Sequence, residues 1–208
     1  MSFAATERER LADMLLRKGP SAPTLCEGWT TQDLAMHLFL RENRPDAAVA
    51  IFFPALASYE RKVKESYQHL DYEELVNRWR RGPQRYNPIR FLDSLINTSE
   101  HFIHFEDVRR AEGDWEPREF SAAVNDSLVR ILRLIGVRLL SQSAAPIHLV
   151  PTGYPPITAA DTRRVAQRGD NGVHVFGDPG ELLLFATGRD AVDIRIDGDA
   201  NLITRSSL

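Results

Sequence analysis

The feature that most constrains the fold of this chain is a series of segments whose apolar residues recur with the period of an α-helix. The clearest cover about residues 4–18, 88–112 and 118–142, and another begins with Thr30 as its N-cap and is interrupted at Pro45. Each segment has an apolar stripe along one side. Because a single amphipathic helix cannot bury such a stripe by itself, the segments together predict a helical bundle.

The stretch between the segment that begins at Thr30 and the segment 88–112 is helical in pattern but heavily charged. We expect one or two peripheral helices within residues 58–81, followed by a break in the sequence RGPQRYNP. Pro88 suits the first position of the next helix, with Asn87 as its cap. Gly113 suits the end of that helix.

The pattern changes after the sequence SQSAAP. The short apolar runs IHLV and VHVF, and the alternating run AVDIRID, are typical of strands. The segment GDPGELLLFATGRD predicts a short helix with Asp178 as N-cap, Pro179 at its first position and Gly188 as its terminator. The sequence therefore predicts an α+β protein with two domains, a helical bundle in residues 1–145 and a small α/β domain in residues 146–208.

Composition and charge narrow the classes of function. The chain has 208 residues and a formal net charge of -3, with its basic residues spread out, so we expect neither nucleic acid nor a membrane as a partner. No segment approaches the roughly 20 apolar residues that a membrane-spanning helix needs.

The single cysteine, Cys26, excludes an internal disulfide and fits a reducing compartment. The charged N-terminal stretch predicts a helix rather than a signal peptide, so we expect a cytoplasmic protein. The sequence carries no signal for the oligomeric state.

One short stretch, SEHFIHFEDVRR, contains a pair of residues with metal-ligating side chains. Glu100 and His104 are four residues apart, so on a helix they share a face and lie about one turn from each other. A carboxylate oxygen and an imidazole nitrogen are suitable zinc ligands. His37, on the inward side of the second predicted helix, is the best candidate for a third ligand. His101 is turned by about 100° from Glu100 and is not expected to share the site.

The same residues also fit an arrangement without a metal. Glu100 and His104 flank the apolar stripe of their helix, where a solvated polar flank near Asp107 would look the same, and His37 would then be an ordinary buried histidine. From spacing alone, both interpretations stay open. Cys26 lies just before the second predicted helix, and we interpret it as a small buried hydrophobic residue rather than a nucleophile or a ligand.

Three stretches together resemble a known family. LCEGWTTQDLAMHL, SEHFIHFEDVRR and FGDPGELLLFATGRDAVDIRIDGD are similar, in this order, to the mycothiol-dependent maleylpyruvate isomerase group of the DinB-like metal-binding superfamily. The resemblance covers most of the chain and is weakest in residues 58–87. It implies an N-terminal DinB-like four-helix bundle that carries a divalent metal, generally zinc. It also implies a small C-terminal α/β domain similar to sterol-carrier-like domains.

The resemblance implies roles for individual residues. The metal ligands of the family match His37, Glu100 and His104, and an arginine that the family is thought to need for activity matches Arg189 in TGRD. Pattern alone favours a surface position for Arg189, so its catalytic role is implied by the resemblance only. Many DinB-like members use three histidines, and the glutamate at position 100 places this chain nearer the isomerase-like branch.

The function implied is that of a metal-dependent enzyme, with zinc as the expected metal, that uses an exogenous low-molecular-weight thiol such as mycothiol. The thiol would add to a small electrophilic substrate, with carboxylated molecules among the candidates, and the reaction would be an isomerisation or an S-transfer. The alternative is a non-catalytic, metal-stabilised bundle that binds a ligand or a protein partner. In that alternative a fourth protein ligand would close the metal site.

Overall fold

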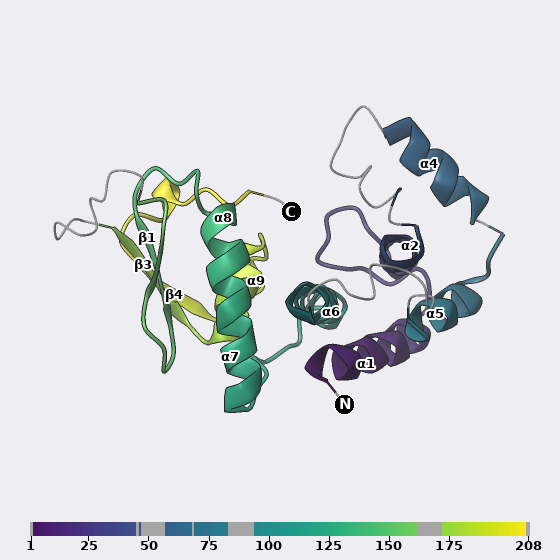
Figure 1. Ribbon diagram of the computed structural model, residues 1–208, viewed down its shortest axis with the longest axis horizontal. Coiled ribbons are helices and arrows are strands. Elements are labelled where there is room, and N and C mark those ends of the chain that lie inside the picture. The colour runs from purple at the N-terminus through teal and green to yellow at the C-terminus, as the bar shows by residue number, and fades with distance from the viewer. Residues whose placement is uncertain are drawn as a thin grey trace. The chain divides into compact units, whose positions relative to one another are not determined.

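The computed structural model describes residues 2–44, 46, 57–67, 69–82, 94–161 and 172–206. The chain divides into two compact units, Met1–Trp115 and Glu116–Leu208. The described part of the first unit is mainly helical, and the second unit combines helices with a four-stranded sheet (Figure 1). The prediction of a mixed α+β protein is therefore confirmed.

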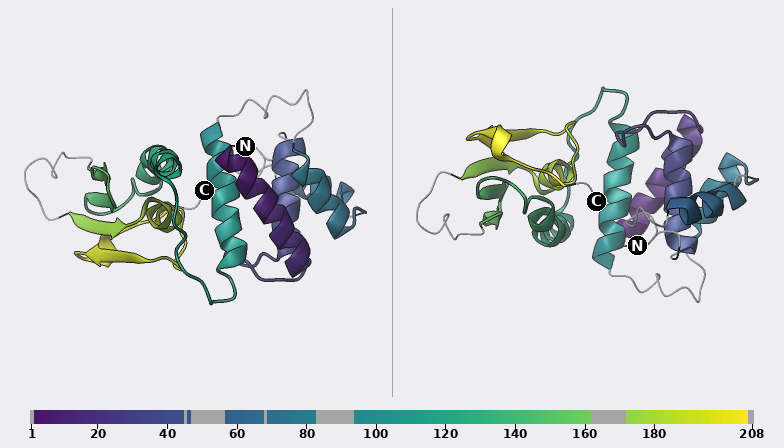
Figure 2. Two further views of the ribbon diagram at one scale, coloured as in Figure 1. Left: turned by 90° about the horizontal axis from the view of Figure 1, so that it is seen from below. Right: turned by 90° about the horizontal axis from the view of Figure 1, so that it is seen from above.

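The first unit is a group of packed helices. Its described helices are α1 (Phe3–Lys18), α2 (Thr31–Asn43), α4 (Ala57–Ser66), α5 (Tyr72–Arg80) and α6 (Ser94–Arg109). α6 packs along α1, and α5 packs against both α2 and α1. Figure 2 shows α1, α2 and α6 gathered into one bundle. α2 and α6, which are far apart in sequence, are joined by contacts between side chains such as Arg41 and Asn97.

The start of α2 follows the predicted signals. Thr30 is the N-cap, because its hydroxyl oxygen accepts a hydrogen bond from the Asp33 backbone N–H at 3.4 Å, and its own N–H donates to the Asp33 carboxylate at 3.2 Å. This reciprocal capping box fixes where the helix begins, and hence which side of it carries His37. The predicted interruption at Pro45 and the predicted helix start at Pro88 lie outside the described residues.

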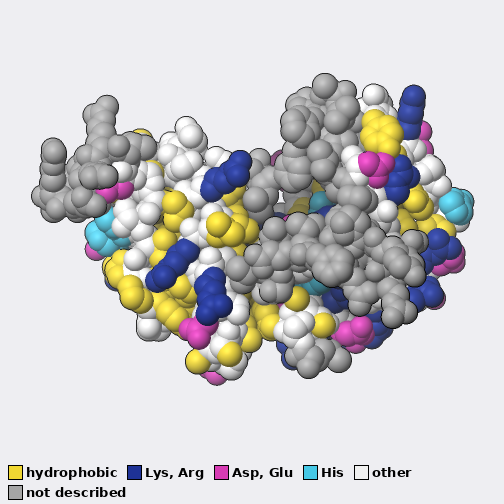
Figure 3. Space-filling model, viewed as in Figure 1, with side chains coloured by type: hydrophobic (Ala, Val, Ile, Leu, Met, Phe, Trp, Pro, Cys, Tyr) yellow, Lys and Arg dark blue, Asp and Glu magenta, His cyan; other side chains and the backbone are white. Residues whose placement is uncertain are grey.

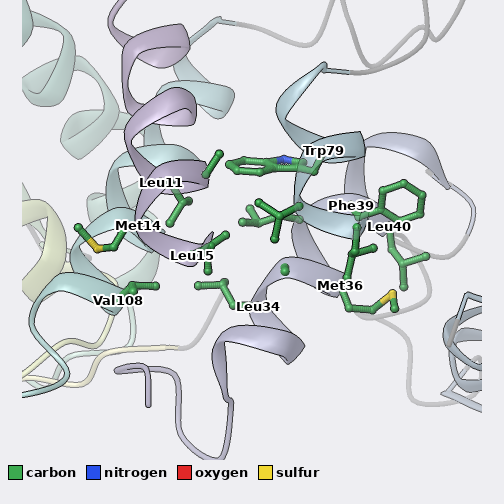
Figure 4. Packing of buried hydrophobic residues seen from close by; sticks show 14 of the residues in the cluster. Leu11, Met14, Leu15, Leu34, Met36, Phe39, Leu40, Trp79 and Val108 are labelled. Carbon is green, nitrogen blue, oxygen red and sulfur yellow. The ribbon is translucent and has the colours of Figure 1, made fainter. Parts of the chain in front are cut away.

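The core of the first unit lies where α1, α2, α5 and α6 meet. Figure 4 shows Leu11 and Leu15 of α1 beside Leu34 of α2, with Trp79 of α5 across the same cluster. All four side chains are fully buried. The prediction that residues 58–81 form only peripheral helices is therefore wrong for α5. The charged residues of α5 occupy its outer side, while its apolar stripe enters the core.

The second unit packs helices against a mixed sheet. Its elements are α7 (Ala122–Ile131), the π-helical turn η3 (Leu132–Gly136), α8 (Val137–Leu139), β1 (Ile147–Pro151), β2 (Ile157–Ala159), β3 (Val173–Gly177), α9 (Pro179–Ala186), β4 (Ile194–Asp197) and the 3-10 turn η5 (Ala200–Leu202). The strand order is β2-β1-β3-β4, in which β1 and β3 are parallel and both outer pairs are antiparallel. The predicted strands and the predicted short helix are found, whereas β2 has no counterpart among the predictions.

The boundary between the units differs from the prediction. The predicted fourth helix corresponds to α7, η3 and α8, and both α7 and η3 pack against α9 of the second unit. Gly136 of η3 lies close to α9: a Cβ atom built on this glycine would be in van der Waals contact with the Cβ atom of Ala186, at 3.5 Å. Because the apolar stripe of this helix is buried within the second unit, the division falls between Trp115 and Glu116 rather than after residue 145. A DinB-like four-helix bundle is therefore not confirmed.

The surface carries charges of both signs. Figure 3 shows Lys and Arg side chains spread among acidic and hydrophobic ones over the described part of the face that it presents. No helix among the described residues has both the length and the apolar composition to cross a membrane. The expected small-molecule partners and cytoplasmic location stay predictions.

Candidate metal centre

The predicted ligands come together where α2 faces α6. The Glu100 Oε2 atom lies 3.8 Å from the His37 Nε2 atom and 3.5 Å from the His104 Nε2 atom. The centroids of the two histidine rings are 5.4 Å apart. The candidate ligand atoms of these three residues all lie within 4.8 Å of one another. The structure thus brings together the three residues that the sequence singles out. Metal binding by these residues stays a prediction.

The spacing of these atoms resembles that of ligands around an ion more than that of hydrogen-bond partners. Ligands about 2 Å from a tetrahedral ion lie roughly 3.3 Å from one another. The Glu100 Oε2 atom is 3.5 and 3.8 Å from the two imidazole nitrogens, and it is buried without a hydrogen-bond partner among the described residues. A buried carboxylate oxygen in this state is unusual. A cation between the three side chains would satisfy it.

Burial and neighbouring charges shift the ionisation of all three groups. Burial lowers the pKa of His37, which keeps its imidazole neutral near pH 7. Burial alone would raise the pKa of the Glu100 carboxyl, but the facing histidines outweigh it and hold that pKa well below its ordinary value. Burial also opposes the charged form of His104, yet the contacts with Asp107 and Cys26 raise the pKa of His104 well above its ordinary value. The metal-free site therefore favours an ionised Glu100 with positive charge beside it.

Asp107 supports His104 from the side opposite Glu100. The Asp107 carboxylate is fully buried, and its Oδ2 atom accepts a hydrogen bond from the His104 Nδ1 atom at 2.9 Å. A bond to Nδ1 selects the tautomer whose Nε2 atom is free to bind a metal. The His37 Nδ1 atom, by contrast, is buried and has no hydrogen-bond partner in the part of the chain that the structure describes. The orientation of His104 is thus better defined than that of His37.

The structure corrects two interpretations drawn from the sequence. Asp107 is buried against His104, so it does not belong to a solvated flank of α6. Cys26 is half-buried and donates a hydrogen bond to the Asp107 Oδ2 atom at 3.2 Å, so it does not behave as a simple hydrophobic residue. Cys26, His104 and Asp107 form a second set of potential ligands. Their separations of 2.9 and 3.2 Å are those of hydrogen bonds already made.

The site retains contact with solvent. The side chains of His37, Glu100 and His104 keep 19%, 22% and 11% of their full exposure. Trp29 covers one side of His37, with 5.1 Å between the two ring centroids. Part of each side chain is therefore accessible to solvent, although the Glu100 Oε2 atom itself is buried.

His101 faces a different part of the bundle, as predicted. Its Nδ1 atom is 2.9 Å from the Ala4 carbonyl oxygen, and its Nε2 atom is 3.4 Å from the Glu42 carboxylate. Glu42 also accepts two hydrogen bonds from the Arg8 guanidinium, at 2.7 and 2.8 Å, and one from the Trp79 indole N–H at 3.1 Å. This buried ionic network ties α1, α2, α5 and α6 together away from the candidate ligands.

Arg41 is a neighbour of the ligands that was not among the residues predicted for the site. Its Nε atom lies 3.4 Å from the Glu100 Oε2 atom, and its Nη1 atom donates to the Asn97 Oδ1 atom at 3.3 Å. The signal was available in the sequence, because Arg41 follows His37 by four residues, the same spacing that pairs Glu100 with His104.

Arg189 lies in the second unit, directly after α9. Gly188 has a φ of 95°, which ends the helix as predicted. The Arg189 backbone N–H donates to the Leu184 carbonyl at 3.0 Å, and its Nη1 atom donates to the Thr187 carbonyl at 2.6 Å. Because Arg189 belongs to the other unit, its predicted role beside the metal ligands stays a prediction.

Comparisons with known proteins add no family assignment. No protein-family model matches the chain, and neither a curated protein nor a solved structure matches it. The resemblance to the mycothiol-dependent maleylpyruvate isomerase group therefore stays a prediction.

Proposed function

We propose that His37, Glu100 and His104 bind one divalent metal ion, with zinc as the preferred metal. The observation that carries this proposal is the buried Glu100 Oε2 atom, which has no hydrogen-bond partner in the described part of the chain and faces the Nε2 atoms of both histidines at 3.5 and 3.8 Å. Two imidazoles and one carboxylate are a donor set that catalytic zinc sites use. Among the described residues this ligand group has three members, which leaves a coordination position for a ligand from solution.

The function that this site supports best is that of an enzyme using an exogenous low-molecular-weight thiol, such as mycothiol, for isomerisation or S-transfer on a small electrophilic substrate. A bound zinc ion would lower the pKa of a coordinated thiol and hold it as thiolate near neutral pH. The partial exposure of His37 and Glu100 supports access for such a molecule. The Cys26 thiol is engaged by Asp107, which favours a thiol from solution over the protein's own.

The residues of the site have separate tasks in this proposal. His37, Glu100 and His104 hold the ion, and Asp107 keeps a proton on the His104 Nδ1 atom so that the Nε2 atom faces the ion. Burial lowers the pKa of His37, so this ligand binds without first losing a proton. The pKa of His104 is raised in the metal-free protein, so its Nε2 atom releases a proton when the metal binds.

Metal analysis tests the proposal. Protein purified without a chelator is expected to contain about one zinc ion per chain. The metal-free protein is expected to bind Co²⁺, which gives a visible absorption spectrum and quenches the fluorescence of Trp29, whose ring lies 5.1 Å from that of His37. A metal-free protein that takes up neither ion would contradict the proposal.

The thiol part of the proposal has its own measurement. Addition of mycothiol or a cysteine derivative to the Co²⁺-loaded protein is expected to produce a thiolate-to-cobalt charge-transfer band. Methylation of the thiol removes the proton that binding would displace, so the corresponding thioether is the control and is expected to give no such band. A cobalt spectrum that no thiol changes would favour the non-catalytic, metal-stabilised bundle.

Replacement of Asp107 by asparagine is expected to weaken metal binding by about 10- to 100-fold. An amide nitrogen beside the His104 Nδ1 atom would favour the tautomer that carries its proton on Nε2, where the metal binds. Competition with a chromophoric chelator measures the affinity. Cys26→Ser is the matched control, because a serine hydroxyl can still donate to the same carboxylate and Cys26 is not one of the three proposed ligands, and its effect is expected to be small. Equal affinity in Asp107→Asn and the unmodified protein would remove Asp107 from this role.

A further inference from the structure

The Arg41 guanidinium lies beside the proposed metal ligands and has few hydrogen bonds to the described residues. Its side chain keeps 14% of its exposure, and its Nε atom lies 3.4 Å from the Glu100 Oε2 atom without forming a hydrogen bond to it. The Nη1 atom donates to Asn97 at 3.3 Å. A guanidinium has five N–H donors, and most of those of Arg41 have no hydrogen-bond partner among the described residues.

The charges around Arg41 indicate what this capacity suits. In the metal-free protein, the Arg41 charge faces the ionised Glu100 carboxylate. A divalent ion and Arg41 would together carry three positive charges. The two carboxylates of the described site, Glu100 and Asp107, carry two negative charges, so the net charge of the metal-loaded site would be +1. Such a site attracts an anion rather than a neutral ligand.

We infer that Arg41 and Asn97 form a subsite for the carboxylate group of an anionic ligand that binds at the metal. The planar guanidinium offers paired donors that match the two oxygens of a carboxylate, and Asn97 holds it in place through the bond to Nη1. Arg41 lies one turn from His37 on α2, and Asn97 lies one turn from Glu100 on α6, so the subsite adjoins the ligand group on both helices. This inference rests on the proposed metal site and names carboxylated electrophiles as the substrate class.

The test uses the full chain loaded with Co²⁺ and titrated with acetate, with acetamide as the neutral isostere. Acetate is expected to change the visible spectrum of the cobalt, and acetamide is not. In Arg41→Gln the acetate affinity is expected to fall roughly 10- to 100-fold, because a charge-assisted hydrogen-bonded pair is lost. The Co²⁺ affinity of this variant is expected to stay equal or to rise, since a cation beside the ion has been removed.

Controls separate recognition of the anion from support of the metal site. Arg78→Gln, which removes an exposed arginine paired with Glu74 on α5, is expected to change neither affinity. Arg41→Lys keeps the charge but loses the paired donors, so its acetate affinity is expected to lie between those of the unmodified protein and Arg41→Gln. This second variant also serves if Arg41→Gln does not fold.

Several outcomes would overturn the inference. Equal acetate affinity in the unmodified protein and both Arg41 variants would remove the subsite while leaving the metal site intact. A parallel fall in acetate and Co²⁺ affinity would show that Arg41 only positions Glu100. A fall in acetate affinity confined to Arg189→Lys would assign the carboxylate to Arg189 instead. Failure of the unmodified protein to bind Co²⁺ would overturn the metal site and the subsite together.

Discussion

Replacement of His104 by alanine is expected to weaken zinc binding by roughly 10²- to 10³-fold. A structural zinc site contributes about 10–16 kcal/mol through four ligands, so the loss of one ligand removes about 3–4 kcal/mol. Of the two proposed histidine ligands, His104 has the better defined orientation, through the 2.9 Å bond between its Nδ1 atom and Asp107. Titration of the metal-free protein with Zn²⁺ against a competing chelator measures the change.

The fold of the same variant is expected to survive. The core of the first unit is made by apolar side chains such as Leu11, Leu34 and Trp79, none of which contacts a metal in the proposed site. We expect the helical circular dichroism of the metal-free variant to be retained. Its free energy of unfolding should fall by about 1–3 kcal/mol, because the buried Asp107 carboxylate loses a hydrogen-bond partner.

An exposed histidine provides the control for this experiment. His69→Ala is expected to change neither zinc affinity nor stability, because His69 lies on the surface between α4 and α5. Unchanged zinc affinity in His104→Ala would remove His104 from the site. Complete unfolding of His104→Ala would show that the metal is structural and would favour the non-catalytic alternative.

Removal of Glu42 is expected to cause the largest loss of stability. Glu42→Ala should lower the free energy of unfolding by about 3–5 kcal/mol at pH 7, because it leaves the charge of Arg8 in the bundle without its carboxylate partner. The Glu42 carboxylate accepts hydrogen bonds from Arg8 and Trp79 and lies against His101. Urea unfolding followed by circular dichroism measures the loss.

The contribution of Glu42 is expected to depend on pH. Burial alone would raise the pKa of Glu42, but His101 and Arg8 outweigh it and hold that pKa below its ordinary value. Because the pKa is lower in the folded than in the unfolded state, the stabilisation is fully present above about pH 4.3. It is lost as the pH falls through the folded-state pKa.

A comparison of stabilities across pH tests this expectation. The difference in stability between the unmodified protein and Glu42→Gln should be large at pH 7 and should shrink in acid below about pH 4. Glu74→Gln, which breaks an exposed pair with Arg78, is the control and should cost less than about 1 kcal/mol at either pH. A difference that stays constant between pH 7 and strong acid would show that Glu42 acts through packing rather than charge.

The sequence predicts those parts of the site that depend on local periodicity. The four-residue spacing places Glu100 and His104 on one face of a helix, and the Thr30 cap sets the face of α2 that carries His37. Burial of Asp107 was not predictable in the same way, because it depends on which helix packs against that side of α6. Arg41 had the right spacing, but its direction toward Glu100 depends on the same tertiary contact.

The sequence was least informative about which helices share a core. The apolar stripe of residues 118–142 shows that this segment must be buried, but a stripe does not identify the surface that buries it. In the structure α9 covers that stripe, and α5, charged on its outer side, takes a place in the core of the first unit. Both errors have the same cause, because the apolar pattern of an amphipathic helix does not identify the helix or sheet against which it packs.

The buried ionic network has a consequence for the geometry of the proposed metal site. His101 and His104 are three residues apart on α6 and face different groups, and His101 is held by the Ala4 carbonyl on α1 and by Glu42 on α2. These bonds fix the rotation of α6 about its own axis. If α6 turned about its axis by one residue, or about 100°, His104 would leave the position opposite His37. The arrangement of the three proposed ligands therefore depends on a cluster that includes none of them.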